Sequence, residues 1–63
     1  MKYQVSVKTQ NSNNVFNTNV EADRIGQATT SAMIQFLKNN KLHGDMVLYK
    51  VVDENNNVVL NQF

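Results

Sequence analysis

The chain contains no cysteine and no proline, and it has only two glycines and one histidine among its 63 residues. Without cysteine it can form neither a disulfide nor a thiolate zinc site, and one histidine cannot supply a histidine cluster. Small domains usually supplement a thin hydrophobic core with disulfides, a metal or a partner chain. Of these reinforcements, self-association is the one that the composition leaves open.

Charged residues and long apolar runs are also sparse. Six basic and five acidic residues give a net charge of +1, without the basic stripe that nucleic-acid binders use. No apolar run approaches the roughly 20 residues that span a bilayer, and residues 1–4 lead into an alternating strand instead of a signal peptide. We therefore expect one domain over residues 1–63, cytoplasmic and without membrane contact. The absence of cysteine fits that reducing compartment.

Asparagine is abundant, with eleven copies, three of them consecutive at residues 55–57. The codons of an AT-rich genome explain this bias. Together with the small size, it suits a bacterial, prophage or plasmid accessory gene.

Residues 2–9 place Tyr3, Val5 and Val7 on one side and polar residues on the other, which is typical of a half-buried antiparallel strand. The asparagine-rich residues 10–14 predict a hairpin loop before a second strand over 15–21.

From Ile25 the apolar spacing becomes helical, and it predicts a helix over 23–42. Asp23 is the expected N-cap, Gly44 the left-handed stop, and Gly26 a point of close approach to the sheet. Ile34 falls on the opposite side of the helix and is expected to face solvent.

Two further strands are expected over 45–53 and 57–62, joined by the turn-rich residues 53–56. The fold class is therefore α+β: a ββαββ domain in which one helix packs on one face of a four-stranded, mainly antiparallel sheet. In element order the chain resembles the immunoglobulin-binding domains of streptococcal protein G. That resemblance implies the strand order 2-1-4-3 and carries no function, because no residue motif is shared.

The second hairpin is apolar on both of its faces. If the even positions of the third strand face the helix, Val47, Tyr49 and Val51 face away; if the odd positions do, Met46, Leu48 and Val52 face away. A strand of this kind is typical of an interior position, so either the strand order differs from 2-1-4-3 or a second chain covers the hairpin.

We predict that this hairpin contacts a partner, most simply a second copy of the chain in a homodimer, and otherwise another protein. The expected interface residues are Val47, Leu48, Tyr49, Val51 and Leu60. Tyr49 is the expected anchor, since aromatic residues dominate interface energetics.

Catalytic and metal-binding patterns are weak. His43 and Asp45 are too few for a metal site, and Glu21 and Asp23 suit the start of the helix better than acid–base chemistry. The serines have no neighbouring histidine, and no glycine-rich loop is present for phosphate. We expect no enzymatic activity and no cofactor.

The alternative function is weak nucleic-acid binding. It would use the sheet lysines Lys2, Lys8 and Lys50, with Tyr3 or Tyr49 stacking on bases. Solvated lysines without a ligand are the simpler interpretation.

Overall fold

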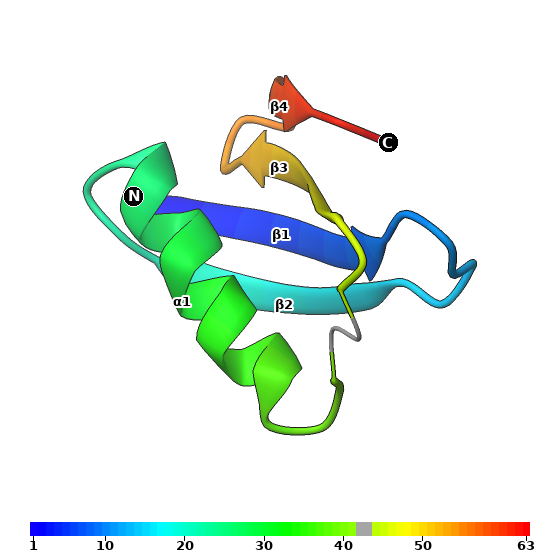
Figure 1. Cartoon of the computed structure of the whole chain (residues 1–63). Helices are drawn as coiled ribbons and strands as arrows, with labels where there is room; N and C mark the ends of the chain where they lie inside the picture. The colour runs from blue at the N-terminus through cyan, green and yellow to red at the C-terminus, as the bar shows by residue number, and fades with distance from the viewer. Residues whose placement is uncertain (42–43) are drawn as a thin grey trace.

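The computed structural model of the chain describes residues 1–41 and 44–63 and has the expected ββαββ order (Figure 1). The elements are β1 (Lys2–Thr9), β2 (Phe16–Glu21), α1 (Ile25–Leu37), β3 (Val47–Asp53) and β4 (Val58–Asn61). The predicted fold class is confirmed: α1 packs on an open sheet of four strands. Within the described residues, no helix has the length and hydropathy that crossing a membrane requires.

The strand order is β2-β1-β3-β4, and every neighbouring pair is antiparallel. The order 2-1-4-3 implied by the resemblance is therefore wrong. β3 lies in the interior beside β1, with Val5 opposite Val51, and β4 forms the outer edge. This position agrees with the apolar character of both faces of β3, because each face of an interior strand is flanked by side chains from two neighbours.

The core lies between α1 and one face of the sheet. Its buried apolar residues are Tyr3, Val5, Val7, Val20, Ala28, Ala32, Phe36 and Val51. Because Val51 is among them, the odd positions of β3 face the helix and the even positions face the helix-free side. The hydroxyl of Thr18 on β2 donates to Gln35 Oε1 at 2.7 Å and fixes one flank of α1 to the sheet.

Both ends of the helix differ from the prediction. The N-cap is Arg24, which makes no side-chain capping bond, so the assignment of Asp23 as the cap is wrong. Instead, Gln27 in the first turn accepts the Asp23 amide at 3.0 Å. The helix ends at Leu37, well before residue 42, because Asn39 and Asn40 form helix poorly.

The two glycines also have different roles from those expected. A side chain at Gly26 would meet no atom within 4 Å, so this residue is not a point of close approach. Gly44 does have a positive φ of 82°, but it lies beyond the end of the helix and does not terminate it.

The turn between β3 and β4 is held by Asp53. One oxygen of its carboxylate accepts the amides of Asn55 and Asn57, each at 2.9 Å. Asn56 takes the left-handed conformation, with φ 64°, and its amide donates to the Asp53 carbonyl. This is a type I turn followed by a left-handed residue, a common three-residue hairpin loop.

Candidate functional site

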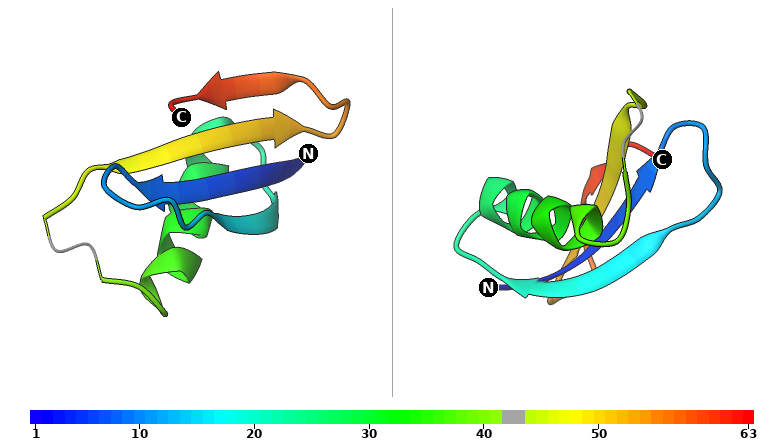
Figure 2. Two further views of the ribbon diagram at one scale, coloured as in Figure 1. Left: turned by 90° about the vertical axis from the view of Figure 1, so that its right-hand side faces the viewer. Right: turned by 60° about the horizontal axis from the view of Figure 1, so that its bottom comes forward.

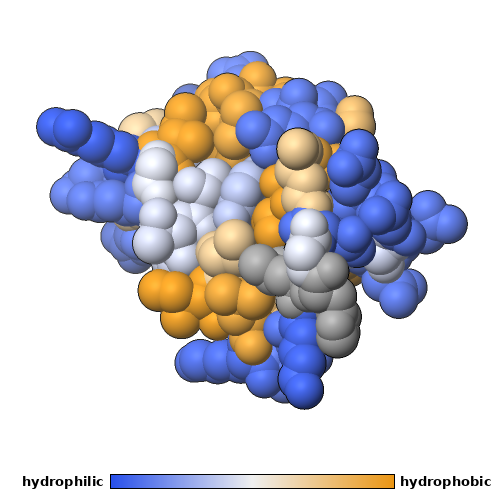
Figure 3. Space-filling view, viewed as in Figure 1, coloured by the Kyte–Doolittle hydropathy of each residue, from blue (hydrophilic) through white to orange (hydrophobic). Residues whose placement is uncertain are grey.

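The helix covers only part of the sheet. It lies along β1 and β2, approaches β3 at few positions and approaches no backbone position of β4 (Figures 1 and 2). The β3–β4 hairpin therefore has little helical cover on one face, around Val51 of β3, and none from α1 on the other. In Figure 3 apolar surface extends over this hairpin at the top of the view, and a second apolar area lies over α1.

The helix-side face of the hairpin carries four of the five predicted interface residues. Val51 is fully buried, so it supports this surface from beneath. Val47, Tyr49 and Leu60 are partly buried and pack against the edge of the core. Burial raises the pKa of the Tyr49 hydroxyl by desolvation. These three side chains leave part of their surface open to a partner.

Leu48, the fifth predicted residue, lies on the other face of the sheet, opposite Lys8 of β1. The Lys8 ammonium lies 5.0 Å from the centre of the Phe63 ring, within the range of a cation–π contact. Val52 and Val58 pair on this helix-free face as well. The predicted interface set is therefore divided between the two faces of one hairpin, and a single flat surface does not contain all of it.

The outer edge of β4 is the most exposed apolar part of the hairpin. Val58 is 54% exposed, Val59 38% and Phe63 45%. The register with β3 shifts between Val51 and Val52, so Val59 bulges out of the ladder. From Val58 to Phe63 the chain has no charged residue and no proline, two of the usual guards of sheet edges.

Val58, Val59 and Phe63 were not among the predicted interface residues. The uncharged stretch over residues 58–63 was the sequence signal that could have identified them. It becomes informative once β4 is known to form the edge of the sheet.

The outer surface of α1 is unusual in a different way. No residue from Ile25 to Leu37 is charged, and Ile34 is 57% exposed, as the helical spacing predicted. A surface helix normally carries charged residues opposite its buried side. Ile34 faces away from the sheet, so this area is separate from the hairpin surface.

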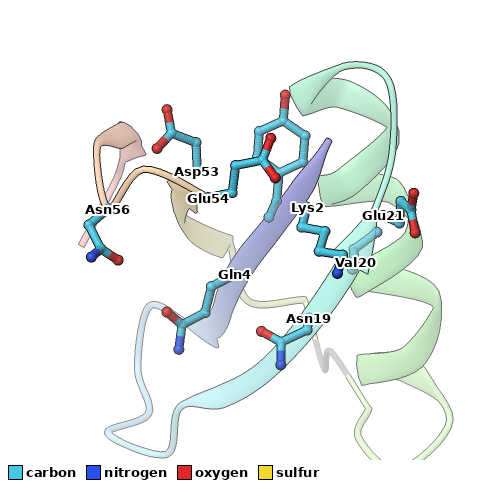
Figure 4. A pocket seen from close by; sticks show the side chains of 9 residues that line it. Lys2, Gln4, Asn19, Val20, Glu21, Asp53, Glu54 and Asn56 are labelled. Atoms are coloured by element: carbon cyan, nitrogen blue, oxygen red, sulfur yellow. The ribbon is translucent and has the colours of Figure 1, made fainter.

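A polar hollow of about 470 Å³ opens where β1 begins, β2 ends and the β3–β4 turn lies (Figure 4). It is lined by Lys2, Tyr3, Gln4, Asn19, Val20, Glu21, Asp53, Glu54 and Asn56. Glu21 and Asp53 lie on opposite sides of β1, and an oxygen of Asp53 is already used in the turn. Glu21 and Asp53 are therefore not a pair of free, adjacent carboxylates for acid–base work.

The candidate nucleophiles and metal ligands are not grouped into a site either. The Ser6 hydroxyl donates to Asn17 Oδ1 at 2.6 Å, an exposed bond between strands and not a nucleophile–base pair. The described residues include no group of acidic, histidine or cysteine side chains able to hold a metal. His43, which with Asp45 supplies too few ligands for a metal site, lies outside the described residues.

The residues expected to bind nucleic acid lie on different surfaces. Tyr3 is only 6% exposed, and Tyr49 faces the helix side of the sheet. Lys8 and Lys50 are on the helix-free side. Neither tyrosine is therefore placed to stack on a base held by these lysines.

Comparison of the chain with protein-family models, with curated proteins and with solved structures finds no match.

Proposed function

We propose that the chain is a small, non-enzymatic interaction module that associates with a second copy of itself through the β3–β4 hairpin. The observation that carries the proposal is the position of β4. It is an apolar, uncharged strand at the edge of the sheet, and the chain's one described helix does not reach it. Edges of this kind are templates for pairing with another chain.

The thin core supports self-association as well. The largest fully buried side chains are three valines, Val5, Val7 and Val51. A domain of this size buries only about 60% of the surface of its unfolded chain, so additional burial in a dimer adds substantially to its stability. Because the chain has no cysteine, no disulfide can add to the stability of the fold. The absence of cysteine is also compatible with a reducing cytoplasm, where we expect the module to act.

Sedimentation velocity over a range from about 1 to 100 µM tests the proposal, since weak to moderate self-association falls in this range. We expect a dimer whose dissociation is promoted by Val59→Lys, because a lysine at the edge strand opposes pairing. The matched control is Ile34→Lys, at another exposed aliphatic residue. It should leave the dimer intact.

A clean monomer at every concentration would refute self-association. Dissociation by Ile34→Lys, with Val59→Lys unaffected, would move the interface to the outer surface of α1.

A second candidate function is weak nucleic-acid binding on the helix-free face, where Lys8 lies over the Phe63 ring. Phe63 is then the aromatic residue available for stacking, in place of the two tyrosines. Binding of a fluorescent single-stranded oligonucleotide at 50 mM salt, lost by 200 mM salt, would support it. Absence of binding at the lower salt concentration would exclude it.

A further inference from the structure

The hydrogen-bonding pattern of β4 shows which of its backbone groups remain available. On its inner side, the Gln62 amide donates to the Tyr49 carbonyl at 2.8 Å, and the ladder pairs Leu60 with Val51. Hydrogen-bonded and non-bonded positions alternate along an antiparallel pair. Asn61 therefore directs its amide and carbonyl groups away from β3, toward the open edge.

The neighbouring positions are less regular. Phe63 lies beyond the end of β4, and its amide donates to the Asn61 side chain at 3.0 Å. Two residues in the other direction lies the bulged Val59. The open edge thus offers the main-chain amide and carbonyl groups of Asn61, while the Phe63 amide is already bonded and the bulge interrupts the alternation at Val59.

We propose that β4 of a second copy pairs antiparallel with this edge, about a two-fold axis that passes beside Asn61. This inference rests on the proposed self-association and specifies its geometry. Asn61 of one protomer would exchange two main-chain hydrogen bonds with the partner's Asn61, and Val59 would lie opposite the partner's Phe63. The two sheets would then continue into one sheet of eight strands.

The charge of the strand favours a second copy as the occupant. Two-fold pairing brings like charges close together across the axis, and like charges opposite each other destabilise a strand pair. From Val58 to Phe63 there is no charged side chain, so self-pairing incurs no such cost. At the opposite edge, β2 ends in Glu21 and alternates exposed asparagines with the residues of its core-facing side.

The contact area also requires the apolar side chains. A pair of short strands contributes main-chain hydrogen bonds but little buried surface, whereas a stable interface buries about 1,200 Å² or more in total. The exposed Val58, Val59 and Phe63 of both copies supply apolar surface directly beside the axis. The pairing is isologous and closes on itself, so it produces a dimer and not a fibre.

Cysteine cross-linking tests this register directly, because the chain has no thiol of its own. In Asn61→Cys the two thiols would meet across the axis. Directly opposed residues in a hydrogen-bonded pair have Cα atoms about 5.5 Å apart, inside the 4.4–6.8 Å range of disulfides. The matched control is Asn19→Cys, another exposed asparagine on the helix-free face of an edge strand.

Under mild oxidation at about 10 µM protein, Asn61→Cys should form a disulfide-linked dimer roughly a hundredfold faster than Asn19→Cys, since pairing raises the local thiol concentration to about millimolar. Non-reducing electrophoresis against time measures both rates. Equal rates, or faster linkage of Asn19→Cys, would overturn the inference.

Sedimentation of the unmodified chain separates this outcome from failure of the proposed function. A dimeric wild type with no preferential Asn61 cross-link refutes the register and leaves self-association standing. A monomeric wild type refutes both.

Discussion

Replacing Val51 by alanine tests the placement of the second hairpin relative to the core. Val51 is fully buried, lies opposite Val5 of β1 and Leu60 of β4, and belongs to the cluster under α1. The sequence alone made it a candidate contact for a partner. The structure makes it a core residue, and these two roles predict very different costs for its truncation.

The expected cost follows from the two methyl groups removed. Each buried group of this size contributes about 0.8 kcal/mol, and the cavity left behind adds to this, so the loss should be about 2–3 kcal/mol. A domain of 63 residues has a total stability of only about 3–9 kcal/mol. With an unfolding entropy of about 130 cal/mol/K for this length, the melting temperature should fall by about 15–23 °C.

Urea and thermal unfolding at one fixed protein concentration measure the loss, because dimerisation makes the apparent stability depend on concentration. Val15→Ala is the matched control. Val15 is 44% exposed and lies outside the hairpin, so its truncation should cost less than about 0.5 kcal/mol. If Val51→Ala is as mild as Val15→Ala, the odd positions of β3 do not face the core and the assignment of faces is wrong.

Three further substitutions test local features of the fold. Gly26→Ala should raise the unfolding free energy by up to about 1 kcal/mol, since the added methyl group meets open space and glycine disfavours helix; an unchanged or lower urea midpoint would contradict this. Asn56→Gly should stabilise by about 0.5–1 kcal/mol, because its φ of 64° suits glycine better, and a lower melting temperature would count against the turn geometry. Tyr49→Phe should remove part of the alkaline loss of stability. Burial raises the Tyr49 pKa above its ordinary 10.0, so the folded chain keeps the proton longer and stability falls as the pH rises beyond about 10. Urea titrations from pH 8 to 11 should show wild type and Tyr49→Phe diverging only at the alkaline end; parallel curves would refute this.

The first hairpin was predictable because its pattern is unambiguous. In β1 the apolar residues alternate strictly with polar ones, and Tyr3, Val5 and Val7 are all buried as expected. In β3 both sets of alternate positions are largely apolar, so periodicity could not decide which face met the helix. That choice depends on the pairing of β3 with β1, a contact between residues 38 to 50 positions apart in the sequence.

The helix boundaries show a different limit of local reasoning. Asp23 and Gly44 are residues that often begin and end helices, and both misled the prediction. A cap forms only where the backbone geometry allows it. Here Arg24 is the N-cap without a side-chain bond, and Gln27 reaches back to accept the amide of Asp23, the residue before Arg24. Asn39 and Asn40 were the better signal for the C-terminal end, since intrinsic propensity is low at two successive positions.

The uncovered hairpin follows from the dimensions of the elements. A helix is about 10 Å wide, and strands lie about 4.8 Å apart, so one helix covers about two strands. A four-stranded sheet with one helix must therefore leave about half of its helix-side face with little cover. Because Thr18 binds Gln35, α1 is held toward β2. It therefore reaches β3 at few positions and approaches no backbone position of β4. The apolar residues of β3 and β4 thus occupy the half of the sheet that the one helix of the described residues covers least. A second copy added at β4 would extend the sheet on the side where burial is still incomplete.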